Sequence, residues 1–544
     1  MKKTFWRIAC SLLATVMLLA TLTSCKIVFE ENPFGDALTS RDTVTTETER
    51  NSAAITIETE EDLPEEELEV PAPEDGSNSG SNNSGSNNNG SNNNGSNNNG
   101  SGGAPNEDPV PEMDWDGRGF NVLSVQNAYA PNFEIVGDLG SDSVSSAVYK
   151  RNLLIEEQYN VTIYEYGNAY EDSFEKLETQ ILSGDNGYDL AFLYRDDMAI
   201  AIASGYMKDL ATVEYLNFSN EWYNQSTLNS MKISGKLFHM VSDFSLIDKA
   251  RTNVLFLNRD LATDNQIPDI VSMVRDGSWT VDKMLKYEQD VATPNGDGIM
   301  DFDAQWGLAA GGKEVVSTFW GCLGNQIVTI NDNGSWTVNL TNDHSLKSVD
   351  FTRQVFNSNI SFCENAFYDN SDAHNVFVGE RCLFLSETLS AIEKISPDAD
   401  FSFTAIPYPK YDMNQTQYYT TNDNTFCATF GIPVCAEDSS FSGFMVEVLS
   451  WKSHTTTFPE YYNVVCKVQN SYDTVCAEML DLVFDGLVFD FGLLYSKNIK
   501  GIRGKLENSI FKGTDITGEY ATISENVENQ IGQIFDSIEM YTKE

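Results

Sequence analysis

Aromatic side chains stand next to amides and carboxylates at three places in this 544-residue sequence. An aromatic ring packs against the apolar CH face of a sugar, and planar amide, carboxylate and guanidinium groups pair with its hydroxyls. The three stretches are therefore candidates for binding a polyhydroxylated ligand, with ordinary core packing as the alternative for each ring. They are Trp222-Tyr223-Asn224-Gln225, Phe319-Trp320, and Tyr418-Tyr419 followed by Asn422, Asp423 and Asn424.

A second polar stretch, TPNGDGIMDFDA (293–304), follows part of the pattern of a calcium-binding loop. Oxygen ligands at alternate residues around a glycine turn, here Gly298, suit the high coordination number of Ca²⁺. The pattern fails at Ala304, where a bidentate acid is required unless Asp303 takes that place. A polar turn without metal is the alternative to a structural calcium site. The candidate ligands are Asn295, Asp297, Asp301 and Asp303.

The residues do not predict an enzyme. The chain has four scattered histidines, no HExxH zinc motif and no GxSxG nucleophile elbow. Paired carboxylates would serve a glycosidase, but with 81 acidic residues the sequence selects no pair. No cofactor is required by any motif.

Strands and helices alternate along the first part of the segment 112–544. The runs FNVLSV (120–125), VTIYEY (161–166) and YDLAFLY (188–194) predict strands, and helical spacing of apolar residues separates them. This order predicts an α/β fold with a mostly parallel sheet. KLFHMVSDF (236–244) and VLFLN (254–258) are predicted strands that lead to a second lobe. Because ligands collect beyond the carboxyl ends of strands, Tyr194, Arg195 and Asp243 become candidate site residues.

The N-terminal segment 1–24 has a basic start and an apolar run of about 15 residues, which is typical of a secretory signal and short for a membrane span. It ends in Leu22-Thr23-Ser24-Cys25, which resembles a bacterial lipobox. That resemblance implies cleavage before Cys25 and acylation of its thiol, so we expect a lipid anchor at the extracellular face of the cell membrane. A plain signal peptide with a chance cysteine is the alternative.

Residues 25–111 predict a disordered spacer, because they hold few large apolar side chains, an acidic run and the repeat GSNNNGSNNNGSNNNG (85–100). As a flexible coil it spans on the order of 50 Å. The formal charge is −47. The first 111 residues hold six basic and 18 acidic residues, which leaves −35 on the rest of the chain. This charge argues against nucleic acid and against anionic lipid headgroups, so the only expected membrane contact is the lipid anchor.

Several motifs together resemble the extracellular solute-binding proteins of ABC importers, in the group whose members mostly take carbohydrates. The resemblance covers roughly 115–460, and it rests on the order and spacing of the motifs more than on any single one. The motifs are GDNGYDLAFLYRDDMAIAIASGYMKDL (184–210), VLFLNRDLA (254–262), DGSWTVDKML (276–285), FVGERCLFLSE (377–387) and AIPYPKYD (405–412).

The resemblance implies two α/β lobes joined by a hinge, which close over a mono- or oligosaccharide and deliver it to an ABC permease with its ATPase subunits. The alternatives are a surface glycoside hydrolase or lyase, a binding protein for peptide or another solute, and a surface adhesin. The residues that the resemblance places at the cleft are Tyr194, Arg195, Trp222, Asp243, Trp320, Glu387 and Asn422.

Overall fold

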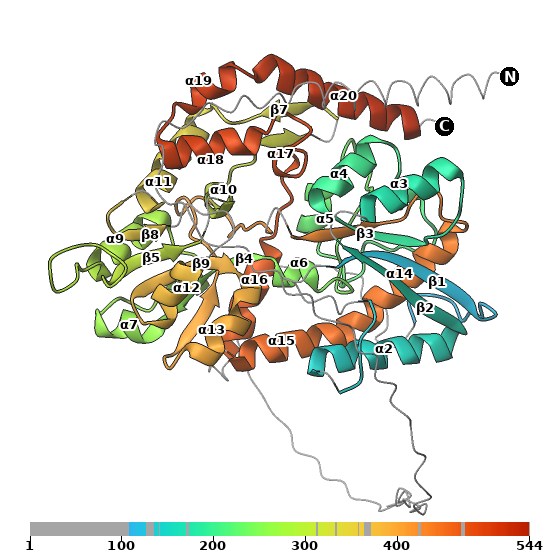
Figure 1. Ribbon diagram of the computed structural model, residues 1–544, viewed down its shortest axis with the longest axis horizontal. Helices are drawn as coiled ribbons and strands as arrows, with labels where there is room; N and C mark the ends of the chain where they lie inside the picture. Colours follow the sequence, from blue (N-terminus) through green and yellow to red (C-terminus); the bar gives the residue numbers. More distant parts are fainter. Residues whose placement is uncertain are drawn as a thin grey trace, which may run out of the picture. The chain divides into compact units, whose positions relative to one another are not determined.

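Two β-sheets, each packed with its own helices, organise the chain in the computed structural model (Figure 1). Cys25, the leader and nearly all of the predicted spacer lie outside the described residues. The structure describes residues 108–542 apart from 127–134, 141, 170–172, 312–313, 332–333, 357, 364–370, 423–425 and 469–473.

The first lobe is built on a four-stranded sheet in the order β11-β3-β1-β2. β1 pairs in parallel with both β2 and β3, whereas β11, which arrives late in the chain, is antiparallel to β3. Its strands are β1 (Arg118–Gln126), β2 (Val161–Ala169), β3 (Leu190–Tyr194) and β11 (Ala428–Gly431). Its helices are α2 (Ser143–Tyr159), α3 (Ser173–Ser183), α4 (Arg195–Ala203), η1 (Leu210–Thr212), α5 (Gln225–Met231) and α14 (Ser439–Thr455).

The second lobe is built on a mixed five-stranded sheet in the order β10-β4-β9-β5-β8, with a small β6-β7 hairpin beside it. Its strands are β4 (Asn253–Asn258), β5 (Trp306–Ala310), β8 (Ser361–Cys363), β9 (Cys382–Thr388) and β10 (Phe403–Ile406), with β6 (Val328–Ile330) and β7 (Trp336–Val338) in the hairpin. Its helices are α7 (Arg259–Asp264), α8 (Ile270–Arg275), α9 (Val281–Val291), α10 (Glu314–Cys322), α11 (Asp343–Phe356), α12 (Ser371–Val378), η2 (Leu389–Ala391), α13 (Ile392–Asp398) and α16 (Thr474–Asp485).

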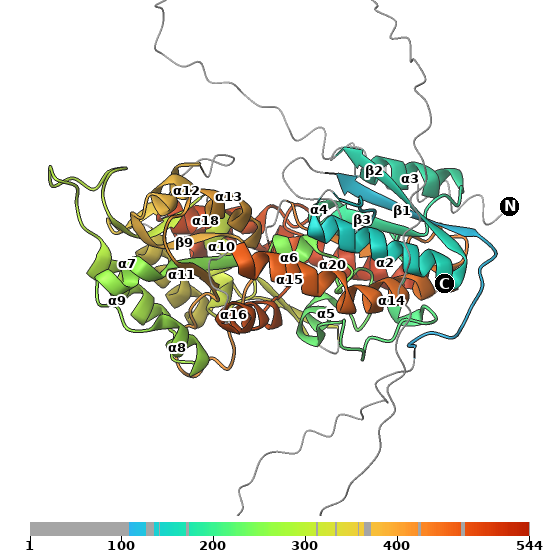
Figure 2. The same cartoon turned by 90° about the horizontal axis from the view of Figure 1, so that it is seen from below.

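Short segments connect the lobes. The helix α6 (Ile247–Ala250) contacts β11 of the first lobe and η2 of the second. The helix α15 (Thr457–Val468) follows α14 and contacts α2 on one side and α13 on the other; Figure 2 shows it beside α2. The C-terminal helices also contact both lobes, since α18 packs on α10 and α11 while α20 packs on α4. These last helices are α17 (Phe491–Leu494), α18 (Ile502–Lys512), α19 (Ile516–Ala521) and α20 (Ser524–Thr542).

Burial follows the predicted periodicities. β3 and β4 are buried along their whole length, as expected for central strands covered on both faces. In α20 the apolar residues Val527, Ile531, Ile534 and Ile538 form one helical stripe, and all four are buried. The predicted strands of the first lobe are also confirmed.

One predicted strand is wrong. Residues 236–244 form only isolated bridges, such as that between Met240 and Phe430, and no strand. The run is apolar and buried, but its backbone bends at the edge of the first lobe, where the Leu237 carbonyl accepts a hydrogen bond from the Leu210 N–H. A short buried apolar run does not distinguish a strand from a buried loop.

Across the part of the chain that is described, no helix is both long enough and apolar enough to span a lipid bilayer.

Candidate ligand-binding cavity between the lobes

A cavity of about 260 Å³ lies where both lobes and the connecting segments meet. The first lobe contributes α5, the second contributes α10 and the turn after it, and the rest comes from the stretches around residues 420 and 490. The lining residues are Ser226, Ser230, Ser317, Trp320, Gly321, Gly324, Asn325, Gln326, Gln417, Tyr419, Thr420, Thr421, Val488, Asp490 and Leu493.

Trp320 is the aromatic residue that the second lobe contributes to the lining. It lies in the last turn of α10, its indole N–H donates to the Ser345 carbonyl (3.2 Å), and its own carbonyl accepts from the Asn325 amide (2.8 Å). The Ser345 hydroxyl donates in turn to the Asn325 side-chain oxygen (3.2 Å). Trp320 is 1% exposed and its ring is packed in the hydrophobic core, so these bonds fix the backbone of the lining beside it.

A connecting segment bound to the start of β4 and to α10 also lines the cavity. The hydroxyls of Thr421 and Thr318 are 2.7 Å apart. The Asn253 amide donates to Thr318 (3.0 Å) and to the Thr421 carbonyl (2.9 Å), while the Thr420 hydroxyl donates to the Asn253 carbonyl (2.7 Å). Gly321 of α10 lies next to this segment, because a Cβ added to it would meet the Thr421 methyl at 3.7 Å.

Asp490 supplies the carboxylate of the lining. It is 3% exposed and accepts hydrogen bonds from the backbone N–H groups of Ile327, Val328 and Gly492. Burial raises the pKa of Asp490 to about 6, although these N–H groups and the nearby Arg195 favour the charged form. Because the anion is already solvated by the backbone, it can still accept hydrogen bonds from a ligand hydroxyl.

The lining as a whole is suited to an uncharged, hydroxylated ligand. It combines hydroxyls and amides with two aromatic rings and one carboxylate, and it contains no lysine or arginine. An anionic ligand of this size would need such cations. Within the described residues, no group of three or more His, Cys, Asp or Glu side chains could hold a metal ion.

The structure brings three of the residues predicted for the cleft close to this cavity. Trp320 lines it. The Arg195 guanidinium donates to the Asn422 carbonyl (3.4 Å) and lies over the Phe489 ring, with its central carbon 5.0 Å from the ring centre. Asn422 follows the lining residue Thr421, and its amide donates to the Asp248 carbonyl (2.6 Å). Arg195 and Asn422 thus support the connecting segments and do not line the cavity.

The other four predicted residues lie elsewhere. Tyr194 is buried, with its ring against Phe426. Asp243 accepts a hydrogen bond from His454 (2.6 Å), whose ring centre lies 6.3 Å from that of Trp222. Glu387 accepts hydrogen bonds from the backbone N–H and hydroxyl of Thr388. None of these four is in the cavity lining, and their role in ligand binding stays a prediction.

The loop predicted to bind calcium forms a tight polar turn. The Asn295 side-chain oxygen accepts from the N–H groups of Asp297 and Ile299, and its amide donates to Asp301 (2.8 Å). The Asp303 N–H donates to Asp301 (3.0 Å). The hydrogen bonds account for the turn, and calcium binding there stays a prediction.

Most of the lining was missed from the sequence. Tyr419 carried a signal as an aromatic beside amides, but the serines and threonines of the lining are small polar residues that occur throughout the chain. Asp490 is one of 81 acidic residues. Its position as the N-cap of α17, bonded to the Gly492 N–H, emerges only in the fold.

A search of curated protein sequences finds no match. Solved structures do match over nearly their whole length. A cyclo/maltodextrin-binding protein complexed with maltotetraose has a TM-score of 0.52 and 12% identity, covering 78% of this chain and 98% of its own. The sugar-binding protein MalE from Xanthomonas citri has a TM-score of 0.53 and 11% identity, and the match covers 78% of this chain and 100% of that protein. The galacto-N-biose-/lacto-N-biose I-binding protein from Bifidobacterium longum has a TM-score of 0.51 and 11% identity, and the match covers 79% of this chain and 99% of that protein.

These likenesses confirm the predicted two-lobed fold. A family model described as bacterial extracellular solute-binding protein matches residues 155–432, from α2 in the first lobe through the second lobe and back to β11. The family consists of binding proteins, which confirms the expectation of a receptor and not an enzyme. Since the match spans just over half of the 544 residues, the chain belongs to the bacterial extracellular solute-binding protein family.

Proposed function

We propose that this protein captures an uncharged carbohydrate in the cavity between its lobes and delivers it to an ABC permease. The observation that carries this proposal is the lining itself. Tyr419 offers a ring face, hydroxyls and amides surround it, and Asp490 is the single charged side chain. This set matches the CH faces and hydroxyls of a neutral sugar and offers nothing to neutralise an anion.

The volume of the cavity limits the size of the ligand. The cavity volume of about 260 Å³ is near the lower end of the range of small-molecule sites, about 300–1,000 Å³. A short saccharide therefore fits this space better than a long chain. Two of the similar structures are complexes with maltotetraose and lacto-N-biose, which supports a sugar as the ligand class.

The mechanism is hinge closure between the lobes. The cavity has one wall on α5 and one on α10, and the stretches around residues 420 and 490 join them. Rotation of the lobes about these stretches brings the walls on α5 and α10 together, so that both contact the ligand. The closed form is then recognised by the permease, and the ATPase subunits drive release. Binding requires no cofactor.

The membrane anchor is part of the same proposal. Acylation at Cys25 would hold the protein at the extracellular face, and residues 26–107 would give the receptor the reach to meet a permease nearby. Globomycin, which blocks the lipoprotein signal peptidase, should cause the uncleaved precursor to accumulate. Cys25→Ser should release the protein into the medium or leave it unprocessed.

Calorimetry and tryptophan fluorescence against mono- and disaccharides, short peptides and charged sugars test the ligand class. We expect saturable binding of a neutral sugar, no binding of its uronic acid counterpart, and no new reducing ends after long incubation. Binding of peptides alone, or release of sugar product, would contradict the proposal.

A further inference from the structure

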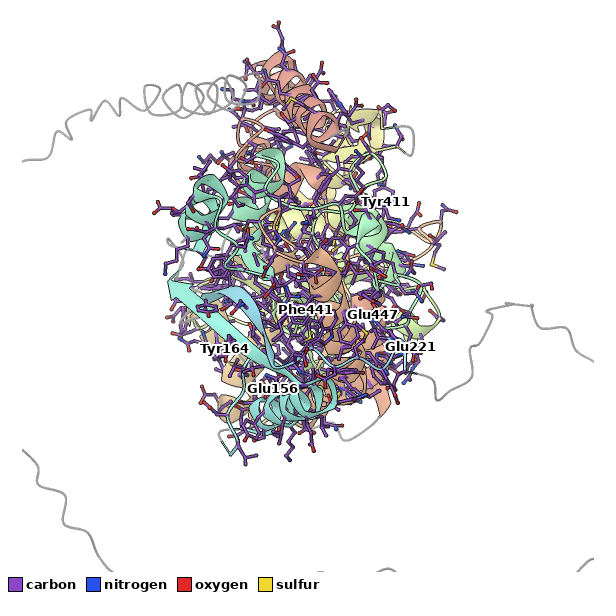
Figure 3. The ribbon with its side chains drawn as sticks, turned by 90° about the vertical axis from the view of Figure 1, so that its right-hand side faces the viewer. Glu156, Tyr164, Glu221, Tyr411, Phe441 and Glu447 are labelled. Atoms are coloured by element: carbon purple, nitrogen blue, oxygen red, sulfur yellow. The ribbon has the colours of Figure 1, made fainter. Side chains whose placement is uncertain are left out.

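A group of tyrosines on the first lobe lies at the surface and outside the cavity lining. Tyr164 and Tyr166 are 48% and 45% exposed, and they lie two positions apart on the edge strand β2. Residues two apart on a strand share a face, with about 6.6 Å between their Cα atoms. Figure 3 labels Tyr164 and views this side of the molecule, with β2 and α2 in front.

Both rings are held in place by their neighbours. A Cβ on Gly119, on the adjacent strand β1, would lie 3.0 Å from the Tyr164 ring, so the glycine lets the ring lie flat across the sheet. The Tyr166 hydroxyl donates to the Asn121 side-chain oxygen (3.2 Å), and its ring meets Tyr188 edge to face at 5.7 Å. A fixed ring with one open face loses little side-chain entropy when a ligand stacks on it.

The hydrogen bonds extend beneath the rings. The backbone N–H and the amide of Asn121 both donate to Asp189 (2.9 and 3.3 Å). Asp189 is only 6% exposed, so its charge serves Asn121 and not the surface. At the start of β1, Arg118 is paired with Asp438 at 3.0 Å. In a chain of charge −47, these residues present rings, hydroxyls and an amide, while the described charges of Asp189 and Arg118 are buried or paired.

We propose that Tyr164, Tyr166 and Tyr188 form a second carbohydrate-binding surface, which holds an uncharged glycan chain on the outside of the first lobe. Two rings in a row take successive sugar units by stacking, and Asn121 and the tyrosine hydroxyls supply hydrogen bonds. None of these residues lines the cavity. The surface therefore works independently of the ligand in the cavity, and its role is to hold a polymer beside the receptor.

The edge of β2 is less suited to another occupant. The side chain of Glu156 in α2 accepts a hydrogen bond from the outward-facing N–H of Ile163 (2.8 Å). This bond occupies the edge position where a strand from a second copy, or from the chain's own N-terminal segment, would pair. Strand addition is thus hindered, while the ring faces stay open.

Affinity electrophoresis of the full chain in native gels tests the proposal, with soluble starch, xylan, mixed-linkage β-glucan and galactomannan as neutral polymers and polygalacturonate as the charged one. We expect at least one neutral polymer to retard the protein. The double variant Tyr164→Ala/Tyr166→Ala should bind it at least about tenfold more weakly, because two stacking contacts are lost. Tyr164→Phe keeps the ring and should bind as the unmodified chain does.

Two controls separate the surface from other effects. Tyr149→Ala removes a tyrosine of similar exposure (39%) on α2 and should leave retardation unchanged. Tyr419→Ala alters the cavity and should also leave it unchanged, even where it weakens binding of small sugars. The proposal is overturned if no neutral polymer retards the protein, if the double variant is retarded normally, or if Tyr419→Ala abolishes retardation. It is also overturned if the double substitution leaves retardation unchanged and only converts a dimer to a monomer in sedimentation, because the tyrosines would then join two copies of the chain.

Discussion

The carboxylate of Asp490 lies 2.5 Å from the backbone nitrogen of Ile327, and its other oxygen lies 2.7 Å from that of Gly492. Ile327 leads into β6 of the second lobe, whereas Gly492 is in α17, so one side chain joins the C-terminal segment to that lobe beside the cavity. A Cβ on Gly492 would lie 2.4 Å from the Cβ of Ile327. This close approach fixes the carboxylate in the cavity wall.

The stability of the protein should depend on the titration of Asp490. Burial raises its pKa from 3.8 to about 6, so the folded state holds the proton more tightly than the unfolded state. The stabilisation is present in full below about pH 4 and is lost as the pH rises through 6, a change of about 3 kcal/mol. Asp490→Asn does not titrate and should lack this slope. Urea unfolding between pH 4 and pH 7 measures it.

The control for this titration is Ser226→Ala, another residue of the lining that carries no titratable group, which should shift the unfolding free energy equally at every pH. If the curves for the unmodified chain and Asp490→Asn stay parallel from pH 4 to pH 7, the carboxyl of Asp490 is not perturbed in the way that its burial implies.

The fold was predictable where one physical pattern determines an element. β3 and β4 are apolar runs of strand length between helical repeats, and α20 repeats its apolar residues every three or four positions. The stretch 236–244 has the same apolar content but runs over a lobe edge. Its conformation depends on contacts with residues far along the chain, such as Phe430, which no local pattern contains.

The site was predictable only through its large side chains. Trp320 and Tyr419 carried a signal because aromatic rings beside amides are uncommon, and the strand-end rule brought Arg195 near the cavity. That rule identifies the end of a strand but does not say whether the side chain there meets the ligand or the hinge. Thr421 and Asp490 come to line one cavity only through the packing of connecting segments, so local composition gave no indication of them.

Tyr419 should contribute to sugar binding more than to folding. It lines the cavity and is half-buried. Tyr419→Ala should weaken binding of the sugar about tenfold by removing a ring face. The cost in unfolding free energy should stay within about 1 kcal/mol, because the ring is not in the core. Calorimetry and thermal unfolding measure the two effects, with Tyr149→Ala as the matched control. Equal affinities for Tyr419→Ala and the unmodified chain would remove this ring from the site.

Asn422 should show the opposite pattern. Its amide donates to the Asp248 carbonyl (2.6 Å) and to the Thr252 hydroxyl (3.1 Å), and its side chain is fully buried. Asn422→Ala leaves a buried carbonyl without this donor, so the unfolding free energy should fall by about 1–3 kcal/mol. Affinity for the sugar should be nearly unchanged at temperatures where the variant is folded. Asn414→Ala, in an exposed turn, serves as the control. A large loss of affinity without loss of stability would return Asn422 to the set of ligand-binding residues.

His454 and Asp243 should form a charged pair that stabilises the junction of α14 with the stretch 236–244. Nδ1 of His454 lies 2.6 Å from Asp243, and Nε2 lies 3.4 Å from Glu221. The hydrogen bond with Asp243 raises the pKa of His454 above 6.5. Its stabilisation is therefore present in full below pH 6.5 and is lost as the pH rises through the higher folded-state value.

The melting temperature of the unmodified chain should exceed that of His454→Gln most at about pH 6, and the difference should shrink toward pH 9. Asp243→Asn should remove the same slope, because the neutral amide no longer favours the imidazolium. His344→Gln removes an imidazole that bonds a backbone carbonyl instead of a carboxylate, and it tests whether any histidine gives this profile. If Asp243→Asn weakens sugar binding but leaves the pH dependence of the melting temperature unchanged, the prediction is wrong and Asp243 binds the ligand. A carboxylate that pairs with His454 would have altered that pH dependence.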